Sequence, residues 1–285
     1  MSQDPVANQL PARGLTFDVR IGGPADGDPV LLLHGFPQNS LEWTGVEPLL
    51  HEAGLRTIAP DQRGYSPGAR PAEAADYQVG EAADDAIALL DTLGLDRAHV
   101  VGHDWGAVAG WFAAARNPAR ITTLTAVSVP HTAAIADIAA RDLGQRARMS
   151  YFTLFRQRGI AETTLTALHG KVLRRMFNGS GLDEREVDQY VAPLLEPGAL
   201  TAALNWYRGT HDRDFAALGP VTVPTTYVWS DGDPVVTRAA AERTAAYVTG
   251  PYRFAELAGI SHWVPDQAPR ELAALILDRV RQPST

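Results

Sequence analysis

The sequence predicts an α/β protein built around a mostly parallel, doubly wound sheet. Short apolar runs that suit strands alternate with segments of helical periodicity along most of the 285-residue chain. Polar motifs come directly after several of these runs, which is where an open parallel sheet places its site. A hydrophobic content of 45% with 20% charged residues is ordinary for a folded protein with a sizeable core. Length alone allows two domains or one large α/β domain.

The first half of the chain predicts strands that alternate with helices. Leu15–Ile21 alternates apolar and polar residues and predicts an edge strand, whereas the run PVLLL at Pro29–Leu33 suits a strand buried on both faces. Residues up to Arg13 contain no apolar run and are expected to form a loose tail. Further strands are predicted at 56–59, 98–101 and 121–129, and helices at 43–53, 79–93 and 106–116.

The pattern changes in the middle of the chain. Between His131 and Phe215 no strand-like run occurs, and helical periodicity recurs at 135–143, 163–177 and 183–195. Strands are then predicted at 225–229 and 252–257, followed by an amphipathic helix at 271–281. We therefore expect a core made of residues 14–130 and 216–282, with a helical cap of residues 131–215 over the carboxyl edge of its sheet.

Composition excludes several classes of function. With 25 Lys+Arg and 33 Asp+Glu the formal net charge is −8, which argues against nucleic acid or an anionic membrane as a partner. The absence of cysteine excludes disulfides, thiolate metal sites and a cysteine nucleophile. We find neither a secretory signal nor an apolar stretch of about 18 residues, and expect a cytoplasmic protein. Lys171 is the only lysine, and this arginine bias suggests a GC-rich bacterial genome.

The strongest chemical signal is the segment VVGHDWG at 100–106, where a strand meets a sharp turn and then a helix. Gly102 and Gly106 flank the centre because such a turn leaves no room for side chains. This is the pattern of a nucleophile elbow, with Asp104 in the position where serine is more common. An aspartate is ionised near pH 7 and needs no base to attack. The alternative role of Asp104 is an ordinary helix N-cap.

A second motif, His34-Gly35-Phe36-Pro37, directly follows the PVLLL strand. In proteins with a nucleophile elbow, the loop at this place gives one backbone N–H to an oxyanion hole, and the residue after the nucleophile gives the other. Those donors would be the amides of Phe36 and Trp105. The alternative is an ordinary loop that contains glycine and proline.

Two further motifs follow predicted strands near the end of the chain. Asp231-Gly232-Asp233-Pro234 comes after the strand at 225–229, and Gly259-Ile260-Ser261-His262-Trp263 comes after the last strand. The order Asp104, Asp233, His262 is that of nucleophile, acid and histidine. His262 would act as the base and Asp233 would hold its tautomer, with Asp231 as a competing acid.

Together these motifs resemble those of the α/β-hydrolases, close to the aspartate-nucleophile branch of epoxide hydrolases and haloalkane dehalogenases. The resemblance covers about 15–281 and rests on HGFP at 34–37, DQRG at 61–64, GHDWG at 102–106, DGDP at 231–234 and SHW at 261–263. It implies a mostly parallel central sheet with helices on both faces and a helical cap inserted after the sixth strand. It also favours Asp233 over Asp231 as the acid. For Arg63 of DQRG we expect a structural salt bridge.

The resemblance to epoxide hydrolases also implies two cap tyrosines that bind the epoxide oxygen. The segments around Tyr151 and Tyr207, the latter within LNWYR, are similar to those that carry them. An opening epoxide needs a proton or a strong hydrogen bond at oxygen, whereas a departing halide suits weak N–H donors. Trp105 is shared by both groups, but Phe36 lacks the second side-chain donor that haloalkane dehalogenases use. Fluoroacetate dehalogenases carry arginine where this chain has Trp105.

We therefore expect an epoxide hydrolase that forms a vicinal diol through a covalent aspartyl ester, without a metal or organic cofactor. A small-molecule epoxide is the expected partner, and the protein is expected to be a monomer or homodimer. A haloalkane or haloacid dehalogenase with the same triad, and a catalytically silent ligand-binding homologue, are the alternatives. The expected catalytic residues are Asp104, His262, Asp233, Tyr151 and Tyr207.

The expected pocket is apolar and aromatic, which favours a neutral substrate. Arginines 156, 158 and 208 are expected to lie on the cap surface, because an inward arginine would favour an acidic substrate. The expected substrate-binding residues are His34, Phe36, Pro37, Trp105, Trp206 and Trp263.

Overall fold

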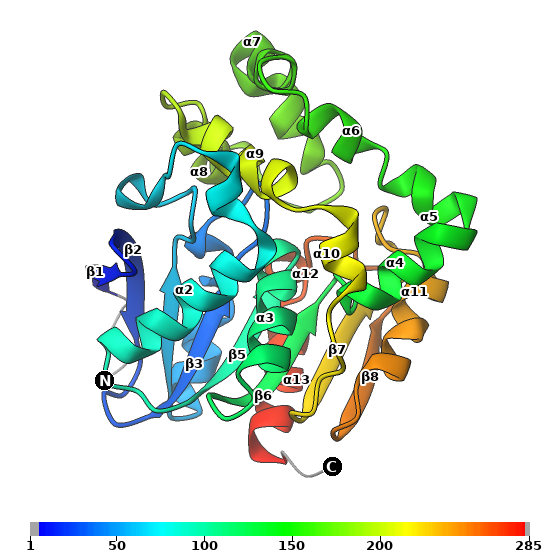
Figure 1. Cartoon of the computed structure of the whole chain (residues 1–285). Helices are drawn as coiled ribbons and strands as arrows, with labels where there is room; N and C mark the ends of the chain where they lie inside the picture. The colour runs from blue at the N-terminus through cyan, green and yellow to red at the C-terminus, as the bar shows by residue number, and fades with distance from the viewer. Residues whose placement is uncertain (1–5, 283–285) are drawn as a thin grey trace.

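A computed structural model describes residues 6–282, and within them eight strands form one sheet in the order β1-β2-β4-β3-β5-β6-β7-β8 (Figure 1). The strand β2 pairs antiparallel with β1 and β4, and the remaining neighbours pair in parallel. This is the doubly wound, mostly parallel sheet that the alternating pattern predicts. The strands are β1 (Val6–Ala12), β2 (Leu15–Gly22), β3 (Asp28–Leu33), β4 (Leu55–Pro60), β5 (Ala98–His103), β6 (Ile121–Val127), β7 (Thr225–Ser230) and β8 (Tyr252–Leu257).

The N-terminal segment differs from the prediction of a loose tail. Residues 6–12 form β1, which pairs with β2 from Val6 opposite Ile21 to Ala12 opposite Leu15. Residues 1–5 lie outside the described part. The prediction was wrong because an edge strand needs apolar side chains on one face only, and here Leu10 and Ala12 supply them. The connecting turn uses Arg13 and Gly14 at φ values of 50° and 78°.

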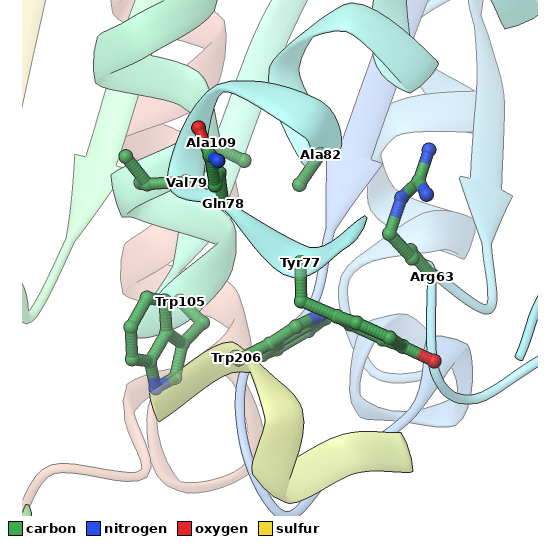
Figure 2. Close-up of a pocket in the computed structure, with 8 residues that line it drawn as sticks. All are labelled: Arg63, Tyr77, Gln78, Val79, Ala82, Trp105, Ala109 and Trp206. Carbon is green, nitrogen blue, oxygen red and sulfur yellow. The ribbon is translucent and has the colours of Figure 1, made fainter. Parts of the chain in front are cut away.

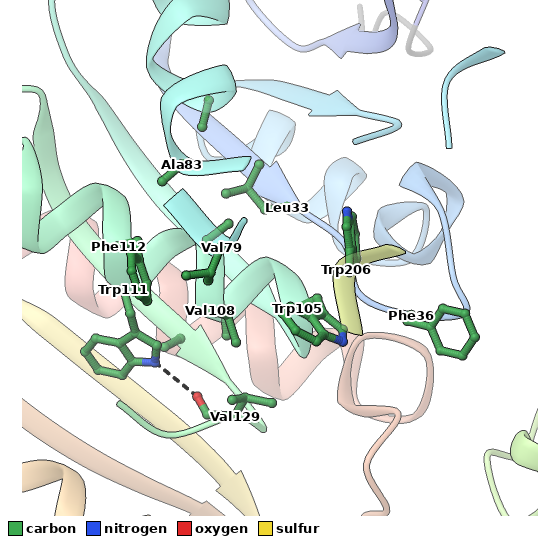
Figure 3. Close-up of a cluster of buried hydrophobic side chains, with 14 of the residues drawn as sticks. Leu33, Phe36, Val79, Ala83, Trp105, Val108, Trp111, Phe112, Val129 and Trp206 are labelled. Atoms are coloured by element: carbon green, nitrogen blue, oxygen red, sulfur yellow. Dashed lines mark hydrogen bonds between the residues drawn. The ribbon is translucent and has the colours of Figure 1, made fainter. Parts of the chain in front are cut away.

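Helices cover both faces of the sheet and create two separate apolar cores. On one face α2 (Val79–Thr92) and α3 (Trp105–Arg116) pack on Leu31 and Leu33 of β3. On the other face α1 (Glu47–Glu52) and α13 (Pro269–Arg281) pack on the alternate residues of that strand. The alternation follows from the two-residue period of a strand. Figure 3 shows part of the first core, where Trp111 Nε1 donates to the carbonyl of Val129 at 3.1 Å.

Between β6 and β7 the described chain contains helices and no strand. These helices, residues 132–216, are called the inserted helices below. Figure 1 shows α6 to α9 beyond one end of the sheet. This end is the carboxyl edge, because Phe36 after β3 and Trp105 after β5 both contact Tyr207. The inserted helices are α4 (Thr132–Arg141), α5 (Leu143–Arg148), α6 (Tyr151–Phe155), α7 (Ile160–Met176), α8 (Glu184–Leu194), α9 (Ala199–Gly209) and α10 (Asp212–Ala216).

Some predicted elements are divided in the structure. The helix predicted at 43–53 is a 3₁₀ turn, η1 (Ser40–Trp43), followed by α1. The helix predicted at 163–177 corresponds to α7, which ends at Met176 and whose backbone is non-helical at 167–170. The remaining short helices are η2 (Pro67–Ala69), η3 (Ala74–Tyr77), α11 (Arg238–Arg243), η4 (Thr244–Tyr247) and α12 (Val264–Gln267). No helix of the described chain is both long and apolar enough to cross a membrane.

Candidate active site

Asp104 lies on the tight turn between β5 and α3, with φ 50° and ψ −118°. Two glycines permit this turn. A Cβ added to Gly106 would lie 1.9 Å from the carbonyl oxygen of Leu33, and one added to Gly102 would lie 2.2 Å from the carbonyl oxygen of Gly106. Although Asp104 precedes α3, its side chain makes no capping hydrogen bond. Capping therefore does not account for the carboxylate, which is left to contact other groups.

The loop after β3 and the imidazole of His262 each contact one oxygen of this carboxylate. The backbone N–H of Phe36 donates to Asp104 Oδ1 at 2.9 Å, and His262 Nε2 lies 3.4 Å from Oδ2. The loop can come so close because residue 35 is glycine. A Cβ there would lie 2.4 Å from that of Asp104. Trp105, the other predicted amide donor, is the first residue of α3.

His262 is oriented by Asp233. The Nδ1–H of His262 donates to Asp233 Oδ2 at 2.8 Å. The other oxygen of Asp233 accepts the backbone N–H groups of Val235 and Val236, at 2.6 and 3.1 Å. Asp231 instead accepts the N–H of Gly259 at 2.6 Å. The geometry thus joins Asp104, His262 and Asp233, and Asp231 serves the turn.

Burial and charge set the ionisation of this triad. Burial disfavours the imidazolium, but the neighbouring carboxylates Asp233 and Asp104 outweigh it and raise the pKa of His262 to about 10. Burial likewise opposes the charged form of Asp104, yet the contact with His262 holds the pKa of Asp104 below its usual value. At neutral pH the resting site therefore contains a protonated His262 between two carboxylates.

A buried pair behind His262 has no counterpart among the predicted site residues. His103 Nε2 and Ser128 Oγ both donate to the carbonyl of His262, each at 2.9 Å. Burial lowers the pKa of His103 to about 4 and raises that of Glu42, whose carboxyl lies 3.3 Å from His103 Nδ1. A neutral His103 that donates through Nε2 accepts at Nδ1, which a protonated Glu42 can satisfy. His103 stands inside GHDWG, whereas Glu42 has no local sequence signal.

Tyr151 and Tyr207 come from two inserted helices, α6 and α9, and face Asp104 across one cavity. The ring centroid of Tyr207 lies 6.1 Å from that of Tyr151 and 5.0 Å from that of Trp105. Burial raises the pKa of both hydroxyls well above the usual value, so both stay protonated. They can therefore act as hydrogen-bond donors at any pH near neutrality.

The cavity has a volume of about 460 Å³ and contains Asp104, His262 and both tyrosines in its wall. Phe36 and Trp263, two of the predicted substrate-binding residues, also line it. The remaining lining residues are Met176, Asn178, Gly179, Gly232, Pro234, Val235 and Ser261. Among the described residues, no group of three or more His, Asp or Glu is placed to hold a metal ion.

Four predicted substrate-binding residues, His34, Pro37, Trp105 and Trp206, are not in the wall of this cavity. His34 is fully buried and accepts the backbone N–H of Gln62 at 2.9 Å, so its position behind the site serves the loops. Trp206 packs against His34 and Tyr65 at ring distances of 5.9 and 5.2 Å. Figure 2 shows Trp206 with Trp105 in a different, very small pocket. The sequence predicts that these residues are buried near the site, but it does not show whether their side chains face the cavity.

None of the three arginines in question lines the cavity with Asp104. Arg156 donates to the carbonyl of Tyr207 and pairs with Asp212 at 2.8 Å, and Arg158 is exposed. Arg208 differs from the surface position predicted for it, because its side chain is only 7% exposed and pairs with Glu162 at 2.9 Å. The buried charge of Arg208 is thus neutralised by Glu162 within the inserted helices.

Arg63 of the DQRG motif forms the expected structural ion pair. Its guanidinium donates through Nε and Nη2 to both carboxylate oxygens of Asp85 in α2, each at 2.7 Å. It also donates to the carbonyl of Asp76 at 3.0 Å. The motif therefore fixes the loop after β4 against α2.

Comparison with known proteins shows to which family and to which solved structures the chain is similar. Residues 28–269 match the alpha/beta hydrolase fold family. The chain is 28% identical to Epoxide hydrolase A of Mycobacterium tuberculosis (strain ATCC 25618 / H37Rv), over 96% of this chain and 97% of that protein. It is 32% identical to the AB hydrolase superfamily protein YfhM of Bacillus subtilis (strain 168), over 94% and 95%. The crystal structure of Epoxide Hydrolase A from Mycobacterium thermoresistibile superposes with a TM-score of 0.86 at 29% identity, covering 97% of this chain and 98% of that one.

Proposed function

Because this chain belongs to the α/β-hydrolase fold family and is similar to epoxide hydrolases over nearly its whole length, we propose that it converts epoxides to vicinal diols through a covalent ester of Asp104. The observation that carries the proposal is the placement of the two tyrosine hydroxyls. Tyr151 and Tyr207 both line the cavity that exposes Asp104, with their ring centroids 6.1 Å apart. Two protonated donors facing a carboxylate suit a neutral ring oxygen that becomes an alkoxide.

In the first step Asp104 opens the ring. Its Oδ1 is held by the Phe36 amide, which leaves Oδ2 to attack a ring carbon. The C–O bond of the ring breaks, and the alkoxide takes a proton from the tyrosine pair. A net transfer of the His262 proton restores the tyrosine. The products are a hydroxyalkyl ester of Asp104 and a neutral imidazole.

In the second step His262 activates water. Esterification removes the charge of Asp104, which is one of the two charges that raise the pKa of His262, so the neutral imidazole can act as a base. It takes one proton from water, and the hydroxide attacks the carboxyl carbon of Asp104. The amides of Phe36 and Trp105 stabilise the oxyanion, and each lowers the activation barrier by roughly 3 kcal/mol. The diol leaves with the other proton, and Asp104 returns as a carboxylate.

The same geometry disfavours the dehalogenase alternative. A halide site needs side-chain N–H donors, but Trp105 is not in the wall of the cavity that contains His262 and both tyrosines, and Phe36 offers no side-chain donor. The arginines that could bind an acid are paired with Asp212 and Glu162 or exposed. A silent binding protein would not need the complete arrangement of Asp104, His262 and Asp233. We therefore favour a neutral epoxide as substrate.

We also propose the division into a core, 14–130 with 216–282, and a cap, 131–215. The inserted helices that carry Tyr151 and Tyr207 fall within this cap, while Asp104, Asp233 and His262 fall in the core. The β1 strand extends the core to residue 6. A cytoplasmic location and a monomeric or homodimeric state stay predictions.

A single-turnover experiment in ¹⁸O-labelled water tests the function and its mechanism together. With enzyme in excess over a styrene-type epoxide, we expect an unlabelled diol, because its new oxygen comes from Asp104. The label should appear in the Asp104 peptide. A labelled diol in the first turnover would show direct attack by water. Halide release from a chloroalkane without any diol formation would establish the dehalogenase instead.

A further inference from the structure

A second, much smaller cavity adjoins the one that contains His262. Its volume is about 30 Å³, against about 460 Å³ for the wide cavity. Asp104, Tyr151 and Val235 line both, so the two cavities meet where the ester would form. The other residues around the narrow cavity are Trp105, Val108, Val129, Thr132, Ile135, Met149, Phe152 and Phe215.

Four apolar side chains form a wall that the narrow cavity shares with a neighbouring groove. Ile135, Met149, Phe152 and Phe215 line the narrow cavity and also line this groove, which has a volume of about 580 Å³. These residues come from the neighbouring helices α4, α6 and α10 and from the end of α5. The narrow cavity is thus limited by side chains, with open space behind them.

We propose that the enzyme selects epoxides that carry a small apolar group, methyl or ethyl in size, on one ring carbon and a larger group on the other. The inference rests on the proposed epoxide hydrolysis and assigns its substrate class. With the ring between Asp104 and Tyr151 at the junction, its two carbons point towards different cavities. About 30 Å³ of free space accepts one or two water-sized groups, whereas the wide cavity accepts an aromatic ring.

The chemistry of the narrow cavity restricts the small group further. Asp104 and Tyr151 stand at the junction. Among the other lining residues, the polar side-chain groups are the hydroxyl of Thr132 and the indole N–H of Trp105. A polar or charged small group would lose its hydration there without regaining hydrogen bonds. A longer alkyl group would have to displace the wall, and Met149 is its most adaptable member.

Two methionines provide a matched pair of variants. Met149 lines the narrow cavity and Met176 lines the wide one, and both are half-buried. The substrates are trans-1-phenyl-1,2-epoxyalkanes, in which the phenyl group is constant and the alkyl group is methyl or butyl. For the wild type we expect kcat/KM to fall at least about tenfold from methyl to butyl. Met149→Ala should reduce this ratio to about threefold or less, and Met176→Ala should leave it unchanged.

Other results would overturn the inference. One is a methyl-to-butyl ratio of kcat/KM near one for the wild type. Another is a ratio that Met176→Ala lowers and Met149→Ala does not. If Met149→Ala does not fold, Ile135→Val tests the same wall with a smaller change and should relieve the ratio partly. Diol formation from the methyl substrate separates the two proposals. If the enzyme forms diol from the methyl and the butyl substrate equally fast, only the proposed selectivity is wrong. If it forms no diol from any epoxide, the proposed function is wrong as well.

Discussion

His262 lies between Asp104 and Asp233, and its charge separates the two halves of the proposed reaction. In the resting site both carboxylates stabilise the imidazolium. Once Asp104 is esterified, one of these charges is gone and the imidazole becomes available to activate water. His262 thereby becomes a base only after the nucleophile has reacted.

Replacing His262 by glutamine should therefore stall the reaction after ring opening. Asp104 still attacks, because an ionised carboxylate needs no base, but no group activates water. We expect kcat to fall at least about a thousandfold and the Asp104 peptide to gain the mass of one substrate, as measured by mass spectrometry. The Asp104→Asn variant is the control without an adduct. Rapid turnover of His262→Gln with no adduct would contradict the two-step scheme.

The charge of His262 also predicts how stability depends on pH. Because its pKa is about 10 in the folded protein and 6.5 as a free side chain, the folded state binds the proton more tightly. This stabilisation is complete below about pH 6.5 and is lost as pH rises from there to about 10. The free energy of unfolding should fall by at most about 1.4 kcal/mol per pH unit in that window. Urea titrations between pH 6 and 9 measure this slope.

Asp233→Asn provides the comparison for the pH experiment. It removes the largest charge effect that raises the pKa of His262, so the slope should become clearly shallower. Equal slopes for the wild type and this variant would show that His262 is not the group responsible.

At the level of single residues, the sequence predicted which side chains meet around Asp104 better than it predicted the residues of the cavity wall. Asp104, Asp233 and His262 follow predicted strands, and strand ends in a parallel sheet converge at one edge. The structure brings these three side chains together. It leaves His34 and Trp206 behind the site, because which face of a loop or helix meets the cavity depends on contacts distant in sequence.

At the level of elements, α5 holds the loop that carries Asp233. The amide of Gln145 is fully buried, donates to the carbonyl of Val235 at 2.9 Å, and accepts both the N–H and the hydroxyl of Thr237 at 2.9 Å. Arg148 of the same helix donates to the carbonyl of Asp233 at 2.6 Å. An inserted helix thus fixes the acid of the core.

Gln145→Leu should weaken the second half of the reaction more than the first. Without these hydrogen bonds the Asp233 loop is less well fixed, and Asp233 acts through His262, whose role as a base belongs to ester hydrolysis. We expect a several-fold accumulation of the Asp104 ester in rapid-quench experiments and a loss of about 1–3 kcal/mol in unfolding free energy. Gln157→Leu is the control, because Gln157 is exposed and bonds within its own segment. Equal slowing of both halves would argue against this role.

The elements that sequence patterns missed share a physical cause. The β1 strand is stabilised by its pairing with β2, and the break in α7 at 167–170 uses left-handed backbone at Leu168, His169 and Gly170. Of these three, glycine alone favours that conformation by itself. Strand pairing and tertiary contacts do not appear in local periodicity, which predicted the buried strands and most core helices well.

At the scale of the whole molecule, a buried ion-pair cluster connects three distant parts of the chain. Arg13 from the β1–β2 turn and Arg63 from the loop after β4 both pair with Asp85 in α2, at 2.9 and 2.7 Å. The carboxylate of Asp85 is 5% exposed, so its charge depends on these partners. The cluster therefore links the antiparallel edge to the covering helix.

Arg63→Met should destabilise the protein by about 3–5 kcal/mol, because it leaves a buried carboxylate with one partially exposed arginine. Arg141→Met, which breaks the exposed pair with Asp137, should cost less than about 1 kcal/mol. Chemical unfolding followed by tryptophan fluorescence compares the two. Similar losses for both variants would show that the Arg63 cluster contributes no more than a surface pair.

The two apolar cores on opposite faces of the sheet also differ in how freely they can be redesigned. Apolar side chains that line the two cavities, such as Phe36, Val108 and Ile135, belong to or pack against the core under α2 and α3. The core under α1 and α13, with Leu50 and Ile276 among its members, contributes none. Directed evolution for heat resistance can therefore begin on the α1 and α13 side without reshaping the cavities. Changes on the opposite side alter heat resistance and substrate preference together.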